Sequence, residues 1–155
     1  MASRNVIQLG DEILRKKSKP VKEFDEKLWT LLDDMKETMI KYDGIGLAAV
    51  QIGILRRIVV LDVNNMKLEL VNPEIVDTFG EQCEREGCLS VKGEVGFVKR
   101  PKEVTVTAFD RYGNPFSITG VDLLARAFCH EIDHLDGIVF VDKVIKNNKD
   151  KKGKN

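Results

Sequence analysis

The chain has 155 residues with equal numbers of acidic and basic side chains, and it is 43% hydrophobic and 32% charged. This length suits one globular domain with a substantial core, and the zero net charge provides no overall attraction to nucleic acid or membranes. No apolar run approaches the ~18 residues that cross a bilayer, and the first residues contain no secretory apolar segment. Three cysteines, an odd number, argue against a disulfide framework, so we expect a cytoplasmic protein with reduced thiols.

The first predicted helix covers residues 25–42. Asp25 is suited to cap its start, and Gly44 is suited to a left-handed conformation after its end. The apolar residues of this segment recur at helical spacing: Leu28, Leu31, Leu32, Met35 and Met39. A long helix is therefore expected in the N-terminal part of the chain.

Strands are predicted in the middle of the chain. Residues 57–63 (RIVVLDV) and 67–71 (KLELV) flank Asn64-Asn65, a hairpin turn. Residues 103–110 (EVTVTAFD) alternate in polarity and lead into a turn at RYGNP and a short strand, FSI. With helices on both sides of these strands in the sequence, the fold class is α+β.

A last helix is predicted from about Val121 to Leu135. Thr119 and Asp122 resemble a capping box at its start, and Gly137 is suited to end it. One domain is expected over residues 1–145, followed by a Lys-rich disordered tail over residues 146–155.

The pattern HEIDH, at residues 130–134 of this helix, predicts a metal site. Helix positions four residues apart share a face and lie ~6 Å apart along the axis, so His130 and His134 can bind one ion. Glu131 follows His130 directly, so its side chain lies one residue further round the helix than the first ligand. Catalytic metal sites usually have three protein ligands and one position open for water, so a third ligand is required.

The third ligand is sought by elimination. The chain has no other histidine and no glutamate after Glu131, which excludes metalloproteases that complete their site with a downstream His or Glu. Asp136 is two residues from His134 and is expected to point elsewhere, Asp142 is in a strand-like stretch, and Asp150 is in the tail. The cysteines therefore remain as candidates.

The cysteines differ in their surroundings. Cys129 is rotated ~100° from the ligand face of the helix and is expected to be a small core residue. Cys83 lies in a polar, strand-like context. Cys88 follows Gly87, which permits a close backbone approach to an ion or ligand. Elimination favours Cys88, and a buried structural thiol is the alternative.

The segment GIGLAAVQIG, residues 44–53, has the letters of a dinucleotide-binding fingerprint without its context. That fingerprint needs a strand before it and a helix after it, and here the order is reversed. Taken alone, the segment favours a tight turn packed under a core. Gln51 in such a place can instead donate to a developing oxyanion.

Together, the blocks GIGLAAVQ, EGCLS and HEIDH resemble those of the peptide deformylase family. That family is recognised by G-x-G-x-A-A-x-Q, E-G-C-x-S and H-E-x-D-H in this order, and the resemblance covers roughly residues 5–145. It implies a peptide-deformylase-like catalytic domain over residues 1–145. Antiparallel strands would surround a central C-terminal metal-binding helix, and a long N-terminal helix would complete the fold.

The resemblance implies that Cys88, His130 and His134 bind a divalent ion. Fe(II) is the physiological metal of the family, and Zn(II), Ni(II) or Co(II) can occupy the same site. The reaction implied is removal of the formyl group from the N-terminal formyl-methionine of newly made proteins, with release of formate. Metal-bound hydroxide would attack the formyl carbon, and Glu131 would act as general base and then general acid.

The resemblance also assigns substrate contacts. The backbone N–H of Leu89 and the side-chain amide of Gln51 would bind the formyl oxygen. Ile45 and Gly46 would contact the peptide, Gly46 through backbone hydrogen bonds to an extended chain. Two more apolar-slot residues follow from counting back along the helix face from His130: Leu123 and Ala127. The expected partners are N-formylmethionyl peptides, with no direct nucleic-acid site and no membrane.

Other features leave alternatives open. Glu86 and Arg100 are either an ion pair that holds the cysteine loop or two solvated charges. The family commonly has Pro-Gly where this chain has Lys92-Gly93; the lysine loosens the loop after the cysteine and leaves its subsite preference open. The Lys-rich end is a solvated terminus or, as a weaker hypothesis, a contact with the ribosome.

The rival functions are a metalloendopeptidase and a non-catalytic metal-binding module with a closed site.

Overall fold

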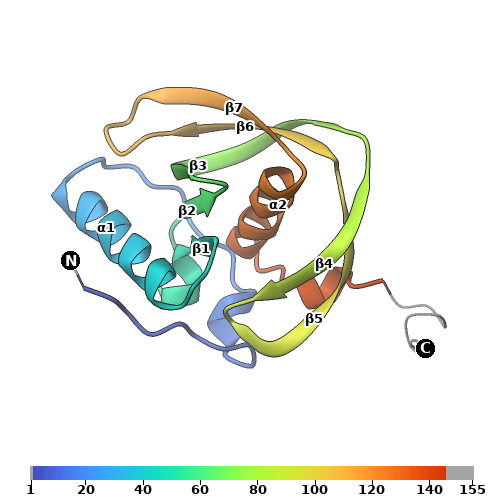
Figure 1. Ribbon diagram of the computed structural model, residues 1–155. Coiled ribbons are helices and arrows are strands. Elements are labelled where there is room, and N and C mark those ends of the chain that lie inside the picture. Colours follow the sequence, from blue (N-terminus) through green and yellow to red (C-terminus); the bar gives the residue numbers. More distant parts are fainter. Residues whose placement is uncertain (1, 146–155) are drawn as a thin grey trace.

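The computed structural model describes residues 2–145 (Figure 1). Within these residues it contains a five-stranded sheet in the order β1-β2-β3-β6-β7 and a two-stranded sheet of β4 and β5, and every pairing is antiparallel. The strands are β1 (Gly46–Ala48), β2 (Ile58–Val63), β3 (Met66–Phe79), β4 (Gln82–Cys88), β5 (Val91–Arg100), β6 (Glu103–Phe109) and β7 (Pro115–Val121). The helices are α1 (Glu26–Lys41), α2 (Leu123–Leu135) and the short 3-10 helices η1 (Glu12–Arg15), η2 (Ala49–Ile52) and η3 (Phe140–Lys143). The predicted α+β class is confirmed.

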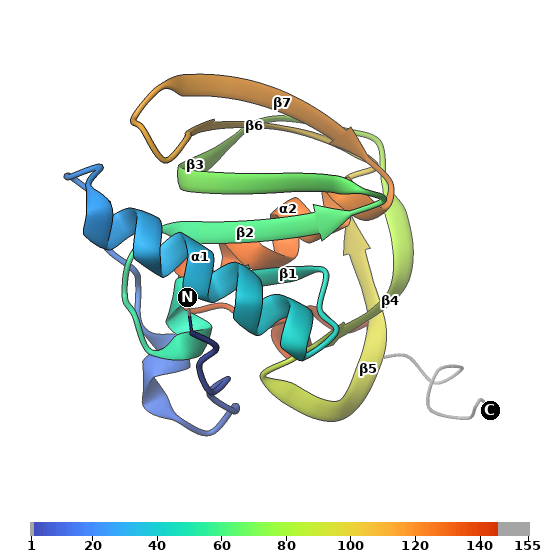
Figure 2. The ribbon, with the colours of Figure 1, turned by 60° about the vertical axis from the view of Figure 1, so that its left-hand side comes forward.

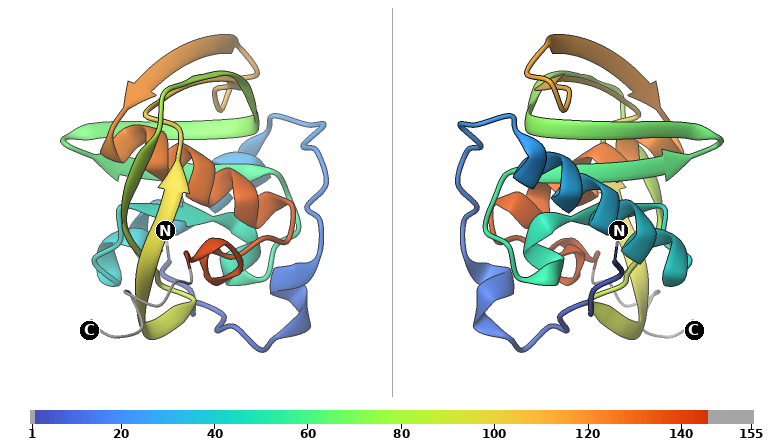
Figure 3. Two further views of the ribbon diagram at one scale, coloured as in Figure 1. Left: turned by 90° about the vertical axis from the view of Figure 1, so that its right-hand side faces the viewer. Right: turned by 90° about the vertical axis from the view of Figure 1, so that its left-hand side faces the viewer.

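Helix α2 lies at the centre of the molecule. The larger sheet curves around one side of it, and the β4–β5 hairpin passes on the other side (Figures 1 and 3). Helix α1 lies across the opposite face of the larger sheet (Figure 2). Because α2 is surrounded in this way, nearly all of its side chains are buried, including those of the HEIDH pattern.

Strand β2 explains how the sheet can carry a core on both faces. Its Val59, Leu61 and Val63 pack into the core that includes α2, while Ile58 and Val60 pack into the core that includes α1. Successive side chains of a strand point to opposite faces, so a strand covered on both sides is apolar throughout. The uninterrupted apolar run Ile58–Leu61 has this cause, whereas the charged Arg57 and Asp62 on either side of it are half-buried.

The predicted first helix is confirmed as α1, but its end differs from the prediction. The Asp25 side chain caps the start, as expected. At the end, the left-handed residue is Asp43, with a φ of 59°, rather than Gly44. A short polar side chain tolerates this conformation. Gly44 serves a different purpose, because a Cβ atom placed there would lie 2.7 Å from Leu89 Cδ1.

The strand predictions are correct in position and too short in extent. The Asn64-Asn65 turn joins β2 to β3, and both residues have positive φ, as hairpin turns of this length favour. Strand β3 does not stop at residue 71 but continues to Phe79 through a bulge at which Asn72 has a φ of 53°. The short strand FSI is part of the longer β7. Strands β4 and β5 had not been predicted as elements.

The start of the last helix was wrongly predicted. Helix α2 begins at Leu123, and Val121 is the last residue of β7. No capping box forms, because Thr119 lies in β7 and the Asp122 side chain accepts no capping hydrogen bond. The chain instead turns sharply through Asp122, which has a φ of 55°. The predicted end is confirmed by Gly137, with a φ of 77°.

The last described segment also differs from its prediction. Asp142 lies in the 3-10 helix η3 rather than in a strand, and it pairs with Arg15 at 2.6 Å. The predicted disordered tail, residues 146–155, lies outside the described residues. Neither α1 nor α2, nor any shorter helix within residues 2–145, has the length and apolarity that a bilayer crossing requires.

Candidate metal centre

Three side chains that can bind a metal converge at the centre of the molecule. Cys88 ends β4, His130 and His134 face it from α2, and the ligand atoms of all three lie within 4.8 Å of one another. Cys88 Sγ is 3.3 Å from His134 Nε2. A thiolate with two imidazoles suits zinc and similar divalent transition metals. Within residues 2–145, this is the one cluster of three or more potential ligands.

The other two cysteines do not reach this cluster. Cys129 is buried in the main core, as predicted, and burial raises the pKa of its thiol to about 11. Cys83 is exposed on β4. All three thiols are free. The fold therefore brings to the histidines the cysteine that elimination favoured.

The electrostatics of the cluster favour a cation. Burial lowers the pKa of His134 to about 3, so this imidazole is neutral and its Nε2 atom can bind an ion. Burial also acts to lower the pKa of His130, but Cys88, Glu131 and Glu86 outweigh it and raise the pKa to about 10. These groups therefore favour a positive charge at the cluster, which a divalent ion would supply in place of the proton. The donor set and its surroundings fit such an ion.

The orientation of His130 is fixed from behind by Glu86. His130 Nδ1 lies 2.9 Å from Glu86 Oε1, which leaves Nε2 on the side of Cys88. Glu86 also accepts hydrogen bonds from Arg100 at 2.8 and 3.0 Å, so the expected ion pair is confirmed and is buried. Burial acts to raise the pKa of Glu86, but hydrogen bonds from Arg100 and His130 outweigh it and lower the pKa to about 2. The carboxylate is therefore charged throughout the neutral range.

Glu131 lies beside the cluster and is nearly inaccessible to solvent, at 5% exposure. Its Oε2 atom is 4.0 Å from His130 Nε2, and its Oε1 atom has no hydrogen-bond partner among the described residues. Burial raises the pKa of Glu131 to about 7, which is the range that suits proton exchange at neutral pH. A Cβ atom placed on Gly46 would lie 2.6 Å from Glu131 Oε2, so the glycine makes room for the carboxylate.

Gln51 reaches the cluster from η2, on the other side of Cys88. Its Oε1 atom accepts from the Ala48 backbone N–H at 2.9 Å, and its Nε2 atom lies 3.1 Å from Ser90 Oγ and 3.6 Å from Cys88 Sγ. The amide nitrogen therefore points toward the cluster. Leu89 is half-buried between Cys88 and Ser90. Ser90 had not been singled out from the sequence, although it belongs to the EGCLS block.

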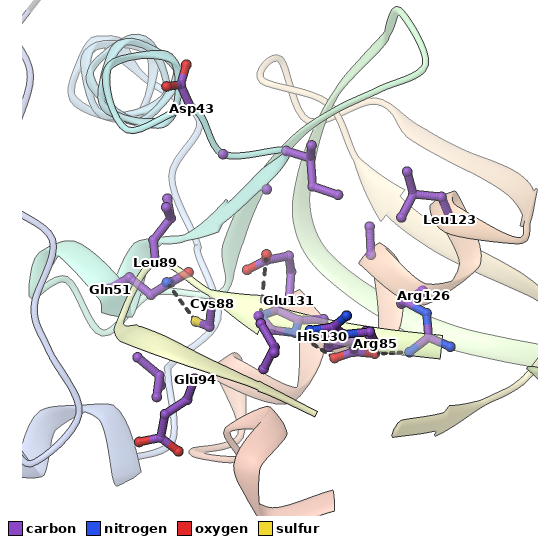
Figure 4. A pocket seen from close by; sticks show the side chains of 18 of the residues that line it. Asp43, Gln51, Arg85, Cys88, Leu89, Glu94, Leu123, Arg126, His130 and Glu131 are labelled. Atoms are coloured by element: carbon purple, nitrogen blue, oxygen red, sulfur yellow. Dashed lines mark hydrogen bonds and ion pairs between the residues drawn. The ribbon is translucent and has the colours of Figure 1, made fainter. Parts of the chain in front are cut away.

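A cavity of about 550 Å³ opens onto the cluster (Figure 4). It brings together all the residues that the sequence assigned to the site except His134, which is fully buried and does not line it. Those residues are Ile45, Gly46, Gln51, Cys88, Leu89, Leu123, Ala127, His130 and Glu131. Its rim also carries charged side chains that the sequence had not indicated: Asp43, Arg85 and Glu94.

Known proteins resemble this chain over nearly its whole length. The sequence model of the family described as "Polypeptide deformylase" matches residues 3–150. A peptide deformylase of Thermoanaerobacter pseudethanolicus is 59% identical over 146 residues, which cover 94% of this chain and 92% of the relative. A peptide deformylase structure from Legionella pneumophila has 50% identity and a TM-score of 0.90, covering 93% of this chain and 87% of that one. The structure from Thermotoga maritima has 37% identity and a TM-score of 0.92, covering 94% and 100%.

These similarities include the parts of the chain that form the cluster and its cavity. The match to the family extends across all three sequence blocks, GIGLAAVQ, EGCLS and HEIDH, and confirms the resemblance inferred from them. The chain therefore belongs to the peptide deformylase family, a family of metal-dependent hydrolases.

Proposed function

We propose that this chain removes the formyl group from the N-terminal formyl-methionine of newly made polypeptides and releases formate. One observation carries the proposal beyond family membership. Glu131 lies buried beside the Cys88, His130 and His134 cluster, at the base of an open cavity, and its Oε1 atom has no hydrogen-bond partner within residues 2–145. A general base beside a metal site with an open position is the arrangement that hydrolysis of an amide requires.

Cys88, His130 and His134 would hold the ion, and Fe(II) is the metal we propose, with Zn(II), Ni(II) or Co(II) as substitutes. A bound divalent ion lowers the pKa of water toward neutrality and polarises the formyl oxygen. The thiol and imidazole donors suit each of these metals. The bond from His130 Nδ1 to Glu86 leaves the Nε2 atom of that ring on the side of Cys88, where it would hold the ion.

Glu131 would move the proton. Its carboxylate takes a proton from the attacking water as the new C–O bond forms, and it returns a proton to the nitrogen as the C–N bond breaks. Formate and a free methionine amine are then the products. A pKa of about 7 allows Glu131 to both accept and donate the proton at neutral pH.

Gln51 and Leu89 would stabilise the oxygen that gains charge in this step. The Gln51 amide is held in place by the Ala48 N–H and by Ser90, and its other N–H, which points to Cys88 Sγ, is the one that would donate to this oxygen. The Leu89 backbone N–H is the second donor. Each donor of this kind is worth about 2.7–4 kcal/mol of barrier.

The methionine side chain would occupy the apolar part of the cavity, between α2 and the segment before β1. Leu123, which is labelled in Figure 4, and Ala127 line it from α2, and Ile45 lines it from the residues before β1. Gly46 would bind the peptide backbone as in strand addition, where main-chain bonds give affinity and one pocket gives the side-chain preference. Such binding tolerates varied sequence after the first residue.

The geometry is less favourable to the rival functions. A metalloendopeptidase of the HExxH type takes its third ligand from downstream, whereas here Cys88 approaches from upstream. A closed structural metal site would not need a cavity of about 550 Å³ leading to it or a buried base beside it.

The experiment is formate release from formyl-Met-Ala-Ser by protein prepared anaerobically with Fe(II). We expect turnover by the native chain and its loss in Glu131→Gln, with the same metal content in both. Glu12→Gln, at an exposed position remote from the cavity, is the matched control and should retain turnover. Absence of turnover in the native chain with one metal bound would contradict the proposal.

The cellular setting is part of the same proposal. The free thiols support a reducing compartment, and we propose the cytoplasm, where formylated nascent chains are the partners. Contact with the ribosome through residues 146–155 stays a prediction, since these residues lie outside the described part of the chain. Unchanged ribosome co-sedimentation after deletion of residues 146–155 would contradict it.

A further inference from the structure

Strand β4 offers a free edge to the cavity. Its only partner strand within residues 2–145 is β5, which pairs along one edge, and residues 85–88 of β4 line the cavity (Figure 4). An unpaired strand edge presents backbone donors and acceptors to an extended peptide. A peptide with its formyl group at the cluster can therefore lie along this edge.

The two faces of β4 differ in character. Gln82 and Glu86 point inward and both contact Arg126 of α2. Side chains of a strand alternate between faces, so Arg85 and Gly87 belong to the outer face, where Arg85 is opposite Phe97 of β5. Arg85 is exposed, in contrast to the buried Glu86 next to it.

The same alternation applies to a peptide that adds to this edge. Its methionine side chain enters the cavity, on the inner face of β4, so the side chain of its second residue points to the outer face. Neighbouring strands place side chains on one face about 5 Å apart when directly opposite and about 7–8 Å apart on the diagonal. Because Gly87 has no side chain, Arg85 is the β4 side chain that the second residue would meet.

The guanidinium of Arg85 is available for such a contact. Among the described residues it forms no ion pair or side-chain hydrogen bond, whereas Arg126, the other arginine of the cavity, is held by Glu86. The two exposed carboxylates of the rim come from other segments: Asp43 follows α1, and Glu94 lies on β5 (Figure 4).

We propose that Arg85 is a specificity-determining residue that favours an acidic side chain, Asp or Glu, at the second position of the formyl-methionyl peptide. The inference rests on the proposed deformylation and concerns which peptides are processed fastest. The contact is exposed, so its effect is modest, about two- to fivefold in kcat/KM between an acidic and a neutral second residue. Salt screens exposed charges, so the preference should shrink at high ionic strength.

The test compares kcat/KM for formate release from formyl-Met-Asp-Ala and formyl-Met-Lys-Ala. For each protein, kcat/KM for the Asp peptide is divided by kcat/KM for the Lys peptide, and this Asp/Lys ratio is compared between each variant and the native chain. Differences in folding or metal loading affect both peptides equally and cancel in the ratio. We expect Arg85→Gln to lower this ratio about two- to fivefold and Arg85→Glu to lower it further. Lys99→Gln is the matched control, since Lys99 carries the same charge on the same hairpin and does not line the cavity. That variant should leave the ratio unchanged.

The possible results separate this inference from the function on which it rests. If both peptides release formate and the Asp/Lys ratio is the same in Arg85→Glu as in the native chain, Arg85 does not set specificity and the proposed function stands. If Arg85→Gln and Lys99→Gln lower the Asp/Lys ratio of kcat/KM equally, the preference comes from the overall positive charge of the β4–β5 hairpin. That result would also overturn the assignment to Arg85. No formate from any peptide would overturn the proposed function and this inference with it.

Discussion

The Nδ1 atom of His130 lies 2.9 Å from Oε1 of Glu86, and the same carboxylate accepts two hydrogen bonds from Arg100. Glu86 is thus held on one side by a guanidinium and holds a proposed metal ligand on the other. The imidazole ring keeps one orientation for this reason, with its Nε2 atom on the cluster side. Glu86, which is not one of the three proposed ligands, therefore orients one of them.

Replacing this carboxylate should weaken metal binding. In Glu86→Gln the amide can still contact His130, but it lacks the charge that polarises the ring. We expect the dissociation constant for Zn(II) to rise about 10- to 100-fold. Competition with a chromophoric chelator measures this directly. Glu84→Gln, at an exposed position of the same strand, is the control, and equal affinities in the two variants would contradict the role of Glu86.

Arg100 should matter for the stability of the whole fold. Its guanidinium is buried and binds both Glu86 and Asp133, the latter at 2.7 Å. Breaking a buried ion pair typically costs about 3–5 kcal/mol. However, Glu86 keeps Arg126 and Asp133 keeps Lys143 as partners. Arg100→Gln should therefore lower the free energy of unfolding by about 3 kcal/mol, the lower end of that range. Lys99→Gln removes an exposed pair with Glu81 and should cost about 0–1 kcal/mol. Urea unfolding of both variants measures the difference, and similar losses would contradict the prediction.

Polar contacts of this kind also explain why β4 was not predicted from the sequence. The inward-facing residues of β4 are Gln82 and Glu86, which are held by arginines rather than by apolar contacts. A search for alternating apolar residues therefore finds no strand there, although the strand carries Cys88. By contrast, β2 and α1 bury apolar residues at regular spacing and were predicted close to their observed limits.

The site itself was predictable where its residues are neighbours in sequence. His130 and His134 share a helix face by spacing alone, and elimination favoured Cys88 as their partner. The rim residues were not predictable, because Asp43, Arg85 and Glu94 come from three separate segments that meet only in the folded chain. The wrongly predicted capping box at Thr119 has another cause. Helix α2 is buried on almost all sides, so no change from polar to apolar periodicity marks its first turn.

Asp34 should make the stability of the protein sensitive to acid. Its carboxylate accepts hydrogen bonds from Arg4 at 2.7 Å and from the Ala2 backbone N–H at 2.8 Å, and the hydrogen bond from Arg4 is the main cause of a pKa below the ordinary 3.8. A carboxyl with a lowered pKa stabilises the folded state above its ordinary pKa, and this contribution is lost as the pH falls through the folded value.

Asp34→Asn should therefore lower Tm at pH 7, and the gap from the native chain should narrow as the pH falls below about 4. Thermal unfolding between pH 7 and pH 2.5 measures it. Asp77→Asn, an exposed position without an ion pair among the described residues, should show no such convergence. A gap for Asp34→Asn that is constant across this pH range would show that the charge of Asp34 is not the cause.

Gly46 should be intolerant of even one added carbon, because of where Glu131 lies. A Cβ atom at Gly46 would be 2.6 Å from Glu131 Oε2 and 2.8 Å from Leu61 Cδ2. The φ of Gly46 is not in the left-handed region, so Gly46→Ala strains packing rather than the backbone. Displacing a catalytic group by about 1 Å can cost about 100-fold in rate, and overpacking costs about 1–3 kcal/mol of stability. We therefore expect Gly46→Ala to fold and bind metal with a lower Tm, and to lose about 100-fold in kcat for formate release. The prediction would be contradicted if Gly46→Ala kept the native kcat and its crystal structure showed Glu131 in the native position. In that case a shift of Leu61 alone would make room for the added carbon.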